Sequence, residues 1–462
     1  MARVAVIGAG AMGLAAAYHA AKAGHEVAVF EAGPTPGGMA AHFDFGGLSI
    51  ERYYHFVCKA DAPTFALLEE LGIGDRMRWR LTSMGYFTGG RLHPWGDPIS
   101  LLSFPDLGLI SKLRYGALMF LSTRRDHWAA LENISAREWI TRWCGKKVYD
   151  RLWRRLFDLK FYEYADNISA AWIWTRIKRL GRSRRSLFQE ELGYIEGGSE
   201  TLVHALQAAI EQRGGRIHVS MPVERIVIKD GVVRGVRVRG TDYAADHVIS
   251  TVPTPFVGAM VPDLDEDWRR RYAEIANIGV ICVLFKLKRS VTKNFWVNVT
   301  DDNIDVPGIV EFSNLRPLPC TVIYVPYYMP TTNPKWSWTD DMLAAEAFAA
   351  IRRINPEISE SDRIAHYLGR LRNASRSAPR VLRAIFRRCK RRFAVCRSPI
   401  PAFIIRRIGE SPKASDWERR WRWRLGHRHE SAFVARQCAL FRDIPCLGRD
   451  FRAGEYPLPH ST

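Results

Sequence analysis

The feature that most constrains the fold of this chain is a strand, a glycine-rich turn and a helix at its amino-terminal end. Residues 3–7 are apolar and mostly β-branched after the initial Arg3, which predicts a short buried parallel strand. The turn that follows is Gly8-Ala9-Gly10-Ala11-Met12-Gly13, and strong helix formers come after it. In such a turn the first glycine permits the tight bend, the second lets the backbone approach a pyrophosphate, and the third allows close helix–strand packing. The amino terminus of the helix offers free amide groups to phosphate.

A second strand and an acidic residue complete this pattern. The helix is predicted to end at Gly24, residues 26–30 form the next strand, and Glu31 stands at its carboxyl end. A carboxylate there accepts hydrogen bonds from a ribose diol, which argues against a 2′-phosphate and therefore against NADP. All the parts occur in register, so the dinucleotide-binding signal is strong. The residues predicted to bind the dinucleotide are Gly8, Gly10, Ala11, Met12, Gly13 and Glu31.

The segment after Glu31 favours a flavin over a nicotinamide cofactor. Gly37 and Gly38, followed by Met39, resemble a glycine pair in the superfamily of flavin amine oxidases, protoporphyrinogen oxidases and phytoene desaturases. The resemblance implies that the backbone of this loop approaches FAD. A flexible turn is the alternative, because glycine pairs are common in turns. Residues 222–226 resemble the strand of these families in which a valine backbone meets the adenine, a role that falls on Val223.

The resemblance implies an α/β fold: a Rossmann-like FAD-binding domain of the glutathione-reductase type with an interleaved α+β substrate domain. It runs in order from Ala2 to about Ala374, and the strand-like residues 295–299 and 308–315 suit bacterial protoporphyrinogen-oxidase-like members. The predicted bounds are 1–73 and 190–253 for the FAD-binding domain, and 74–189, a helical part, and 254–374 for the substrate domain.

No catalytic or metal-ligating constellation is visible in the sequence. The eight cysteines form no CxxC pair and no Cys/His ligand spacing, so we predict no metal site and a reducing, cytoplasmic setting. Catalytic residues stay unassigned, because FAD itself supplies the chemistry in such enzymes. His55 is a candidate proton carrier, with a structural histidine as the preferred interpretation. Lys286 or Lys288 near the flavin is a further hypothesis, with a solvated lysine preferred.

Membrane contact is considered for one segment only. No uninterrupted apolar stretch reaches the length that spans a bilayer. Residues 101–121 mix apolar runs with Asp106 and Lys112. An amphipathic core helix is the preferred interpretation, and peripheral contact with a membrane surface is the alternative.

The positive charge is concentrated in the last part of the chain. The formal net charge is +20, and residues 375–462 hold 21 Lys and Arg against 7 Asp and Glu. A tail that binds nucleic acid or an anionic membrane is one interpretation. We disfavour it, because the segment has no RNA-binding motif and no convincing amphipathic basic helix. We therefore expect no nucleic-acid partner.

A shifted reading frame explains this tail better. The superfamily closes its FAD domain with a strand that ends in an Ala-Asp segment and a helix that begins at the flavin, and nothing similar follows Ala374. If one base was lost near Ala374, the codons from Arg397 through Glu418 are compatible with the string IADTCFYYPEDRGISESVRLG, which restores these features. We hypothesise that residues 375–462 are an aberrant, Arg-rich frameshift product that does not fold natively.

The resemblance implies an FAD-dependent oxidoreductase, amine oxidase-like or desaturase-like, that removes hydride equivalents from an unidentified small-molecule substrate. An inactive nucleotide-binding protein, which has lost the closing element of the FAD domain, is one alternative. A flavin-dependent nonredox isomerase is another. The sequence indicates neither the electron acceptor nor the oligomeric state.

Overall fold

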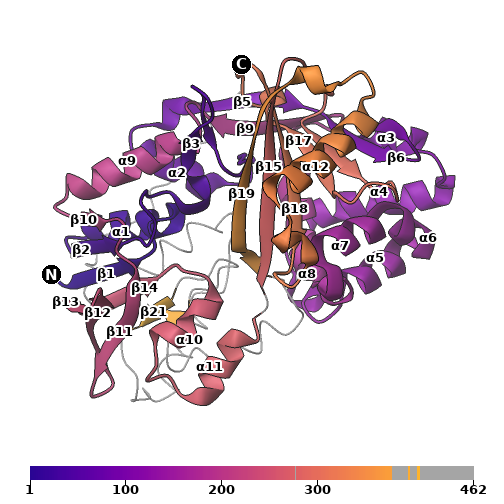
Figure 1. Ribbon diagram of the computed structural model, residues 1–462. Coiled ribbons are helices and arrows are strands. Elements are labelled where there is room, and N and C mark those ends of the chain that lie inside the picture. Colours follow the sequence, from indigo (N-terminus) through magenta and orange to yellow (C-terminus); the bar gives the residue numbers. More distant parts are fainter. Residues whose placement is uncertain (276, 377–393, 396–402, 406–462) are drawn as a thin grey trace, which may run out of the picture.

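The computed structural model describes residues 1–275, 277–376, 394–395 and 403–405 (Figure 1). A six-stranded sheet at the amino-terminal end has the order β10-β2-β1-β14-β21-β20. Its first four strands are mutually parallel, and β21 and β20 pair antiparallel. These strands are β1 (Arg3–Ile7), β2 (Glu26–Phe30), β10 (Arg216–His218), β14 (His247–Ser250), β20 (Ala394–Val395) and β21 (Phe403–Ile405).

Both faces of this parallel sheet are covered, which explains why β1 is apolar at consecutive positions. Val4 and Val6 point to the core formed with helices α1 (Ala11–Lys22) and α9 (Ser199–Glu211). Ala5 and Ile7 point to the opposite core. The elements that build this second core are β11 (Val223–Lys229), β12 (Val232–Val238), β13 (Thr241–Ala244), α10 (Val257–Met260) and α11 (Glu266–Ala273).

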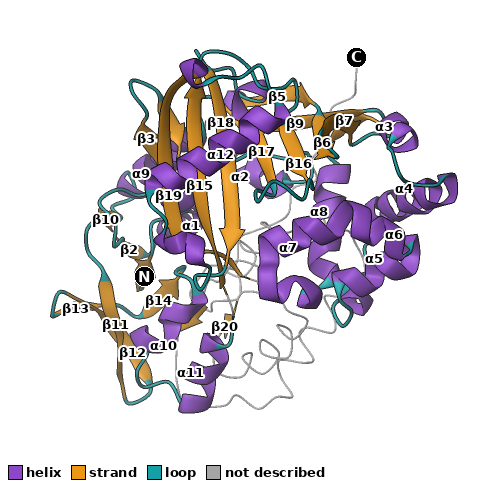
Figure 2. Ribbon diagram, turned by 45° about the vertical axis from the view of Figure 1, so that its right-hand side comes forward, coloured by secondary structure: helices purple, strands orange, loops and turns teal. Residues whose placement is uncertain are grey.

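A seven-stranded sheet forms the centre of the molecule, with the order β19-β15-β18-β17-β16-β6-β7. Helix α12 (Asp340–Ile354) covers one face of it (Figure 2). The hairpin of β3 (His42–Asp44) and β4 (Ser49–Glu51) packs on the other face. The sheet strands are β6 (Met84–Thr88), β7 (Arg91–Trp95), β15 (Asn277–Leu287), β16 (Trp296–Val299), β17 (Gly308–Glu311), β18 (Thr321–Met329) and β19 (Arg363–Arg376).

A helical layer stands beside this sheet, on the right in Figure 2. Its helices share a core rich in tryptophan, tyrosine and phenylalanine. They are α3 (Pro98–Ser103), α4 (Leu109–Arg124), α5 (Ala136–Cys144), α6 (Lys146–Tyr149), α7 (Arg155–Phe161) and α8 (Ala170–Gly181), with a π-helical turn at Asp150–Arg154. The remaining elements are α2 (Ala62–Glu70), β5 (Met77–Thr82), β8 (Arg184–Ser186) and β9 (Gln189–Ile195).

The predicted fold class, a Rossmann-like α/β domain with an interleaved α+β part, agrees with this arrangement. The predicted strand pair forms β16 and β17, where Trp296 opposes Val310. The predicted domain bounds stay a prediction. In the structure, three strands precede the helices within residues 74–189, and α10 and α11, which lie beyond residue 253, pack with β1. Most of the tail, 375–462, lies outside the described residues.

Candidate functional site

The turn between β1 and α1 requires glycine at two positions. Gly8 has a φ of 96°, a conformation that side chains rarely adopt, and its amide donates to the Phe30 carbonyl at 2.8 Å. A Cβ on Gly13 would lie 1.9 Å from the Gly8 carbonyl oxygen. The Thr251 hydroxyl lies behind the turn and donates to the Ile7 carbonyl at 2.9 Å. The helix therefore begins in direct contact with the end of the strand.

The predicted glycine pair lies against this turn. The Gly37 amide donates to the Ala9 carbonyl at 2.8 Å, and Gly37 forms an isolated bridge with Gly10. Gly38, with a φ of 57°, comes so close that a Cβ on it would lie 3.1 Å from the Gly10 Cα. Met39 comes next in the chain, and it is exposed. Two segments predicted separately from the sequence thus meet backbone to backbone.

Glu31 connects β2 to the glycine turn. Its Oε2 accepts a hydrogen bond from the Ala9 amide and its Oε1 accepts one from the Gly33 amide, both at 2.8 Å. The Glu31 carbonyl accepts from the Met221 amide at 2.8 Å. This bond holds the lead-in to β11, two residues before Val223, at the end of β2. The segments that carry the ribose-binding and adenine-binding candidates are therefore joined by a backbone hydrogen bond.

The start of α1 has the properties of a phosphate site. Gly10 is the residue before the helix, and it has no side chain with which to cap the first amides. The first turn holds no acidic residue, so the amides of Ala11 and Met12 are left to an anionic ligand. Backbone amides, absent side chains and a carboxylate at the ribose position together fit a dinucleotide such as FAD.

A buried ionic network fixes the hairpin that follows the glycine pair. The Glu51 carboxylate lies 3.0 Å from the Arg316 guanidinium and 3.4 Å from His42 Nε2, and it accepts from the Ser199 amide at 3.0 Å. Burial acts to raise the pKa of Glu51, but His42 and Arg316 act the other way and leave it below its usual value. The network joins β4 to α9, and so holds the loop after β4 in place.

The three candidates for proton transfer or flavin contact have different surroundings. Burial lowers the pKa of His55, and its Nδ1 has no hydrogen-bond partner within the described ranges. The Lys286 ammonium donates to the carbonyls of Phe45 and Gly46 at 3.1 and 3.0 Å, which holds it at the hairpin turn. Lys288 is exposed. A role for His55 stays a prediction, and Lys286 already has a structural one.

Sequence reasoning missed two cations of the helical layer, Lys160 on α7 and Arg176 on α8. The Lys160 ammonium lies over the rings of Trp296 and Tyr328. Arg176 acts electrostatically on the Tyr54 and Tyr328 hydroxyls, which are 2.8 Å apart. The helical segment is crowded with tryptophan and arginine, and no spacing in it distinguishes these two from their neighbours. Only the tertiary structure brings them together.

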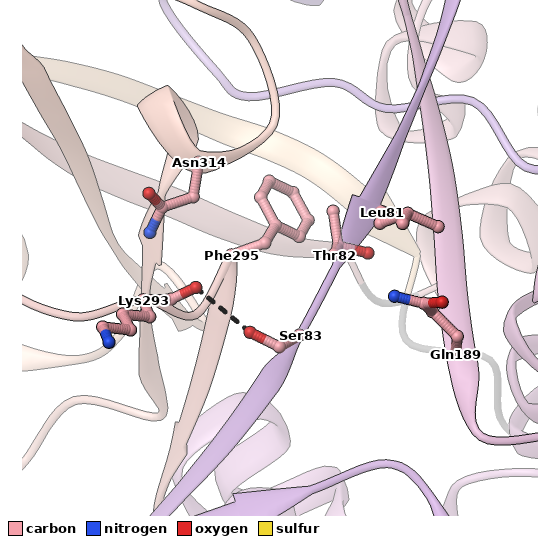
Figure 3. A pocket seen from close by; sticks show the side chains of 7 residues that line it. All are labelled: Leu81, Thr82, Ser83, Gln189, Lys293, Phe295 and Asn314. Atoms are coloured by element: carbon pink, nitrogen blue, oxygen red, sulfur yellow. Dashed lines mark hydrogen bonds between the residues drawn. The ribbon is translucent and has the colours of Figure 1, made fainter.

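A small pocket of about 170 Å³ opens elsewhere (Figure 3). Its wall includes Ser83, whose hydroxyl donates to the Lys293 carbonyl at 3.1 Å, and Asn314, whose amide donates to the Thr292 and Asn294 carbonyls. None of the residues predicted to bind the dinucleotide lines it. We assign it no role.

Comparison with known proteins decides the family. The model of the family described as flavin containing amine oxidoreductase matches residues 13–379. The chain belongs to this family. The predicted recognition and the predicted flavin cofactor, FAD, both agree with this membership.

The known proteins that are similar to this chain have names that refer to different substrates. A 15-cis-phytoene desaturase of Synechococcus elongatus is 24% identical over 290 residues, which cover 56% of this chain and 60% of the desaturase. A putative protoporphyrinogen oxidase of Exiguobacterium has a TM-score of 0.66 at 19% identity, with 83% of this chain and 90% of that one covered. Wild-type putrescine oxidase has a TM-score of 0.63 at 18% identity, covering 83% and 89%. The two structural likenesses show the shared fold.

Proposed function

We propose that this chain is an FAD-dependent oxidoreductase that removes hydride equivalents from a carbon centre of a small-molecule substrate. The observation that carries the proposal is the meeting of the Gly8–Gly13 turn, the Gly37-Gly38 loop and the Glu31 carboxylate. This backbone cradle suits the pyrophosphate and ribose of FAD. Family membership supports the flavin and the reaction class.

The roles of the protein's own residues follow from this arrangement. The α1 amides bind the diphosphate, Glu31 orients the ribose, and Val223 contributes backbone contact to the adenine. Bound FAD would supply the hydride acceptor. Oxidation of a C–N bond, as in the amine oxidases, and of a C–C bond, as in the desaturases, are both within this reaction class.

The test of this function is spectroscopic. We expect purified protein supplied with FAD to show the flavin absorption bands, and acid denaturation to release FAD rather than FMN or NAD. Anaerobic addition of candidate amines and of partly saturated hydrocarbons, including members of each class that carry a carboxylate or phosphate group, should bleach the band with the true substrate. A protein that binds FAD but is reduced by neither class, while dithionite reduces it, would favour the inactive nucleotide-binding alternative. A colourless protein would contradict the cofactor assignment.

We also propose peripheral contact with an anionic membrane surface through α3 and α4. Helix α4 buries Tyr115, Leu118 and Ser122, and leaves a run of apolar side chains exposed. Ile110 is 75% exposed and Leu109 is 64% exposed. The exposed apolar side chains of the two helices are Ile99, Leu102, Leu109, Ile110, Leu113, Phe120 and Leu121. Within the described residues, no helix has the length and apolarity to cross a bilayer.

Charge and apolar area together support this contact. Lys112, Arg114 and Arg124 lie on α4 among the exposed apolar residues, as in interfacial helices that bind anionic lipid. The ammonium of Lys112 donates to the Leu102 carbonyl at 2.6 Å, which ties α3 to α4. The two helices therefore present one surface.

Replacing both Ile110 and Leu113 by aspartate is expected to weaken vesicle binding at least about tenfold, because each side chain contributes on the order of 1 kcal/mol or more on burial. Co-sedimentation with phosphatidylcholine vesicles containing phosphatidylserine measures this. Met342→Asp is the matched control, since Met342 is an exposed apolar residue on α12. Equal sedimentation of the double variant and the parent would contradict the contact.

A further inference from the structure

Three aromatic side chains meet where the helical layer adjoins the central sheet. Tyr54 follows β4, Trp296 lies on β16 and Tyr328 lies on β18. The Tyr54 and Tyr328 hydroxyls are hydrogen-bonded at 2.8 Å, and the Tyr54 and Trp296 rings are 5.6 Å apart in an edge-on arrangement. Tyr54 belongs to the loop after β4, which the Glu51 network holds in place. The group therefore joins this loop to the central sheet.

Two cations face this aromatic group. The Lys160 ammonium lies 5.2 Å from the centre of the Trp296 ring and 6.0 Å from that of Tyr328. The Arg176 guanidinium stacks on Trp172 at 4.8 Å, and it lowers the pKa of the Tyr54 and Tyr328 hydroxyls against their burial. Lys160 lies in the last turn of α7, two residues before Tyr162, whose φ of 48° is a strained value of the kind found at functional sites.

Neither cation has an acidic partner in the described part of the chain. Arg179, one turn along α8 from Arg176, shows the contrast: it binds the Asp61 carboxylate, with Nε and Oδ1 2.8 Å apart. That carboxylate acts on Arg176 only weakly, as the last contribution to its pKa after those of Arg179, Tyr328 and Tyr54. Among the residues that the structure describes, Arg176 is the charged group that acts on the pKa of Lys160, and it lowers that pKa further after burial. Two like charges thus share an aromatic environment.

The cost of this arrangement indicates a missing anion. A charge that is partly removed from water and has no ion partner is destabilised, and contact with an aromatic face offsets only part of this cost. Burial lowers the pKa of Lys160 to about 8, and burial likewise lowers that of Arg176. By accessible surface, Lys160 is half-buried and Arg176 is exposed, so a ligand from solvent can reach both.

We propose that Lys160 and Arg176 bind an anionic group of the substrate, a carboxylate or a phosphate, while Tyr54, Trp296 and Tyr328 pack against its apolar part. This inference rests on the proposed function and names the substrate class for it. A cationic amine would be repelled by the two positive charges, and a plain hydrocarbon would leave them unpaired. The substrate is therefore an acid with an apolar body.

The test uses three probes that share one ring system: 1-naphthoate, 1-naphthyl phosphate and 1-naphthylmethylamine, with 1-naphthamide as the neutral reference. Isothermal titration calorimetry of the full chain, with FAD present, measures their affinities. We expect one of the two anions to bind at least about tenfold more tightly than the amide, since a charged hydrogen bond contributes that much. The better anion identifies carboxylate or phosphate. The amine is expected to bind less tightly than the amide.

Variants assign the preference to the two side chains. Lys160→Gln and Arg176→Gln are each expected to reduce the affinity for the better anion about tenfold and to leave that for 1-naphthamide unchanged. Lys160→Arg, which keeps the charge, should retain most of the affinity for the better anion. Lys147→Gln is the matched control, because it removes an exposed lysine on α6 away from the aromatic group. If both Gln variants still prefer the anion over 1-naphthamide as the parent does, the assignment of the anion site to Lys160 and Arg176 is wrong.

The affinity should also fall with rising pH. Lys160 loses its proton as the pH passes about 8, so the anion is bound most tightly below that pH. Burial raises the pKa of the Tyr54 hydroxyl well above 10, that of Tyr328 to about 12 and that of the Cys282 thiol beyond its usual range, so these groups stay neutral. Arg176 stays charged. In the Lys160→Arg variant the pH dependence should disappear, and its persistence there contradicts the role of Lys160.

The outcomes separate this inference from the proposed function. Flavin uptake is read from the visible spectrum, and the anion preference from calorimetry. A protein that binds FAD but prefers the amine, or binds all four probes equally, refutes the anionic substrate and leaves the oxidoreductase assignment intact. A protein that prefers the anion without taking up flavin supports the anion site and refutes the cofactor assignment.

Discussion

Gly13→Ala is expected to reduce FAD binding at least about tenfold and to destabilise the fold by about 1–3 kcal/mol, as overpacking does in well-packed interiors. The added Cβ would lie 1.9 Å from the Gly8 carbonyl oxygen and 2.9 Å from the Thr251 hydroxyl. Neither obstacle moves easily, because one is a backbone atom and the other is a hydroxyl that is hydrogen-bonded in place. The only relief is to move α1 away from β1, which also moves the amides that bind the diphosphate.

Two measurements check this expectation: titration of the purified protein with FAD, followed by absorbance, and thermal unfolding. Gly108→Ala is the matched control, because Gly108 also stands at the start of a helix and a Cβ on it would meet nothing within 4 Å. If Gly13→Ala binds FAD as the parent does, the α1 amides are not the phosphate site. Loss of stability without loss of FAD affinity would lead to the same conclusion.

The cofactor-binding part of the fold was predictable because its determinants are local. Glycines at positions 8, 10 and 13, the apolar strand before them and Glu31 after them each follow from a turn or packing requirement of adjacent residues. The contact of Gly38 with Gly10 was not derivable from spacing. The resemblance to a known superfamily implied only that the backbone of this loop approaches FAD, and the structure shows that the loop also packs directly against the glycine turn.

The substrate part was not predictable to the same degree, because its contacts join residues far apart in the chain. Lys160 and Trp296 lie on α7 and β16, and nothing in the sequence of either segment indicates that the two side chains meet. The order of the seven-stranded sheet, in which β6 pairs with β16, brings the helical layer to the sheet. Lys286 is a candidate flavin contact because of its residue type. In the structure it instead donates hydrogen bonds to two carbonyls of a hairpin turn.

The direction of one strand bears on the tail. β1, β2 and β14 are parallel, so their carboxyl ends share the edge where Gly8 and Glu31 lie. β21 is antiparallel to β14: Phe403 pairs with Ser250, and Ile405 pairs with Val248. The carboxyl end of β21 therefore lies at the opposite edge of the sheet. β21 thus does not match the closing strand that the resemblance implies, whose carboxyl end would lie at the cofactor.

Restoring the reading frame after Ala374 is therefore expected to raise FAD occupancy at least about tenfold. A parallel closing strand with an Ala-Asp segment and a following helix would add several hydrogen bonds to the cofactor, and each charged or buried bond contributes on the order of 1–3 kcal/mol. It would also cover apolar surface that otherwise favours aggregation. The ratio of flavin absorbance to protein absorbance, measured for both purified chains, gives the occupancy.

A chain truncated after Arg376 is the control, because it removes the basic tail without adding the closing element. We expect it to bind FAD as weakly as the present chain, which would show that the gain comes from the restored segment and not from the loss of positive charge. Equal occupancy in the present and restored chains would refute the frameshift hypothesis, as would an intact reading frame across the Ala374 codon on resequencing.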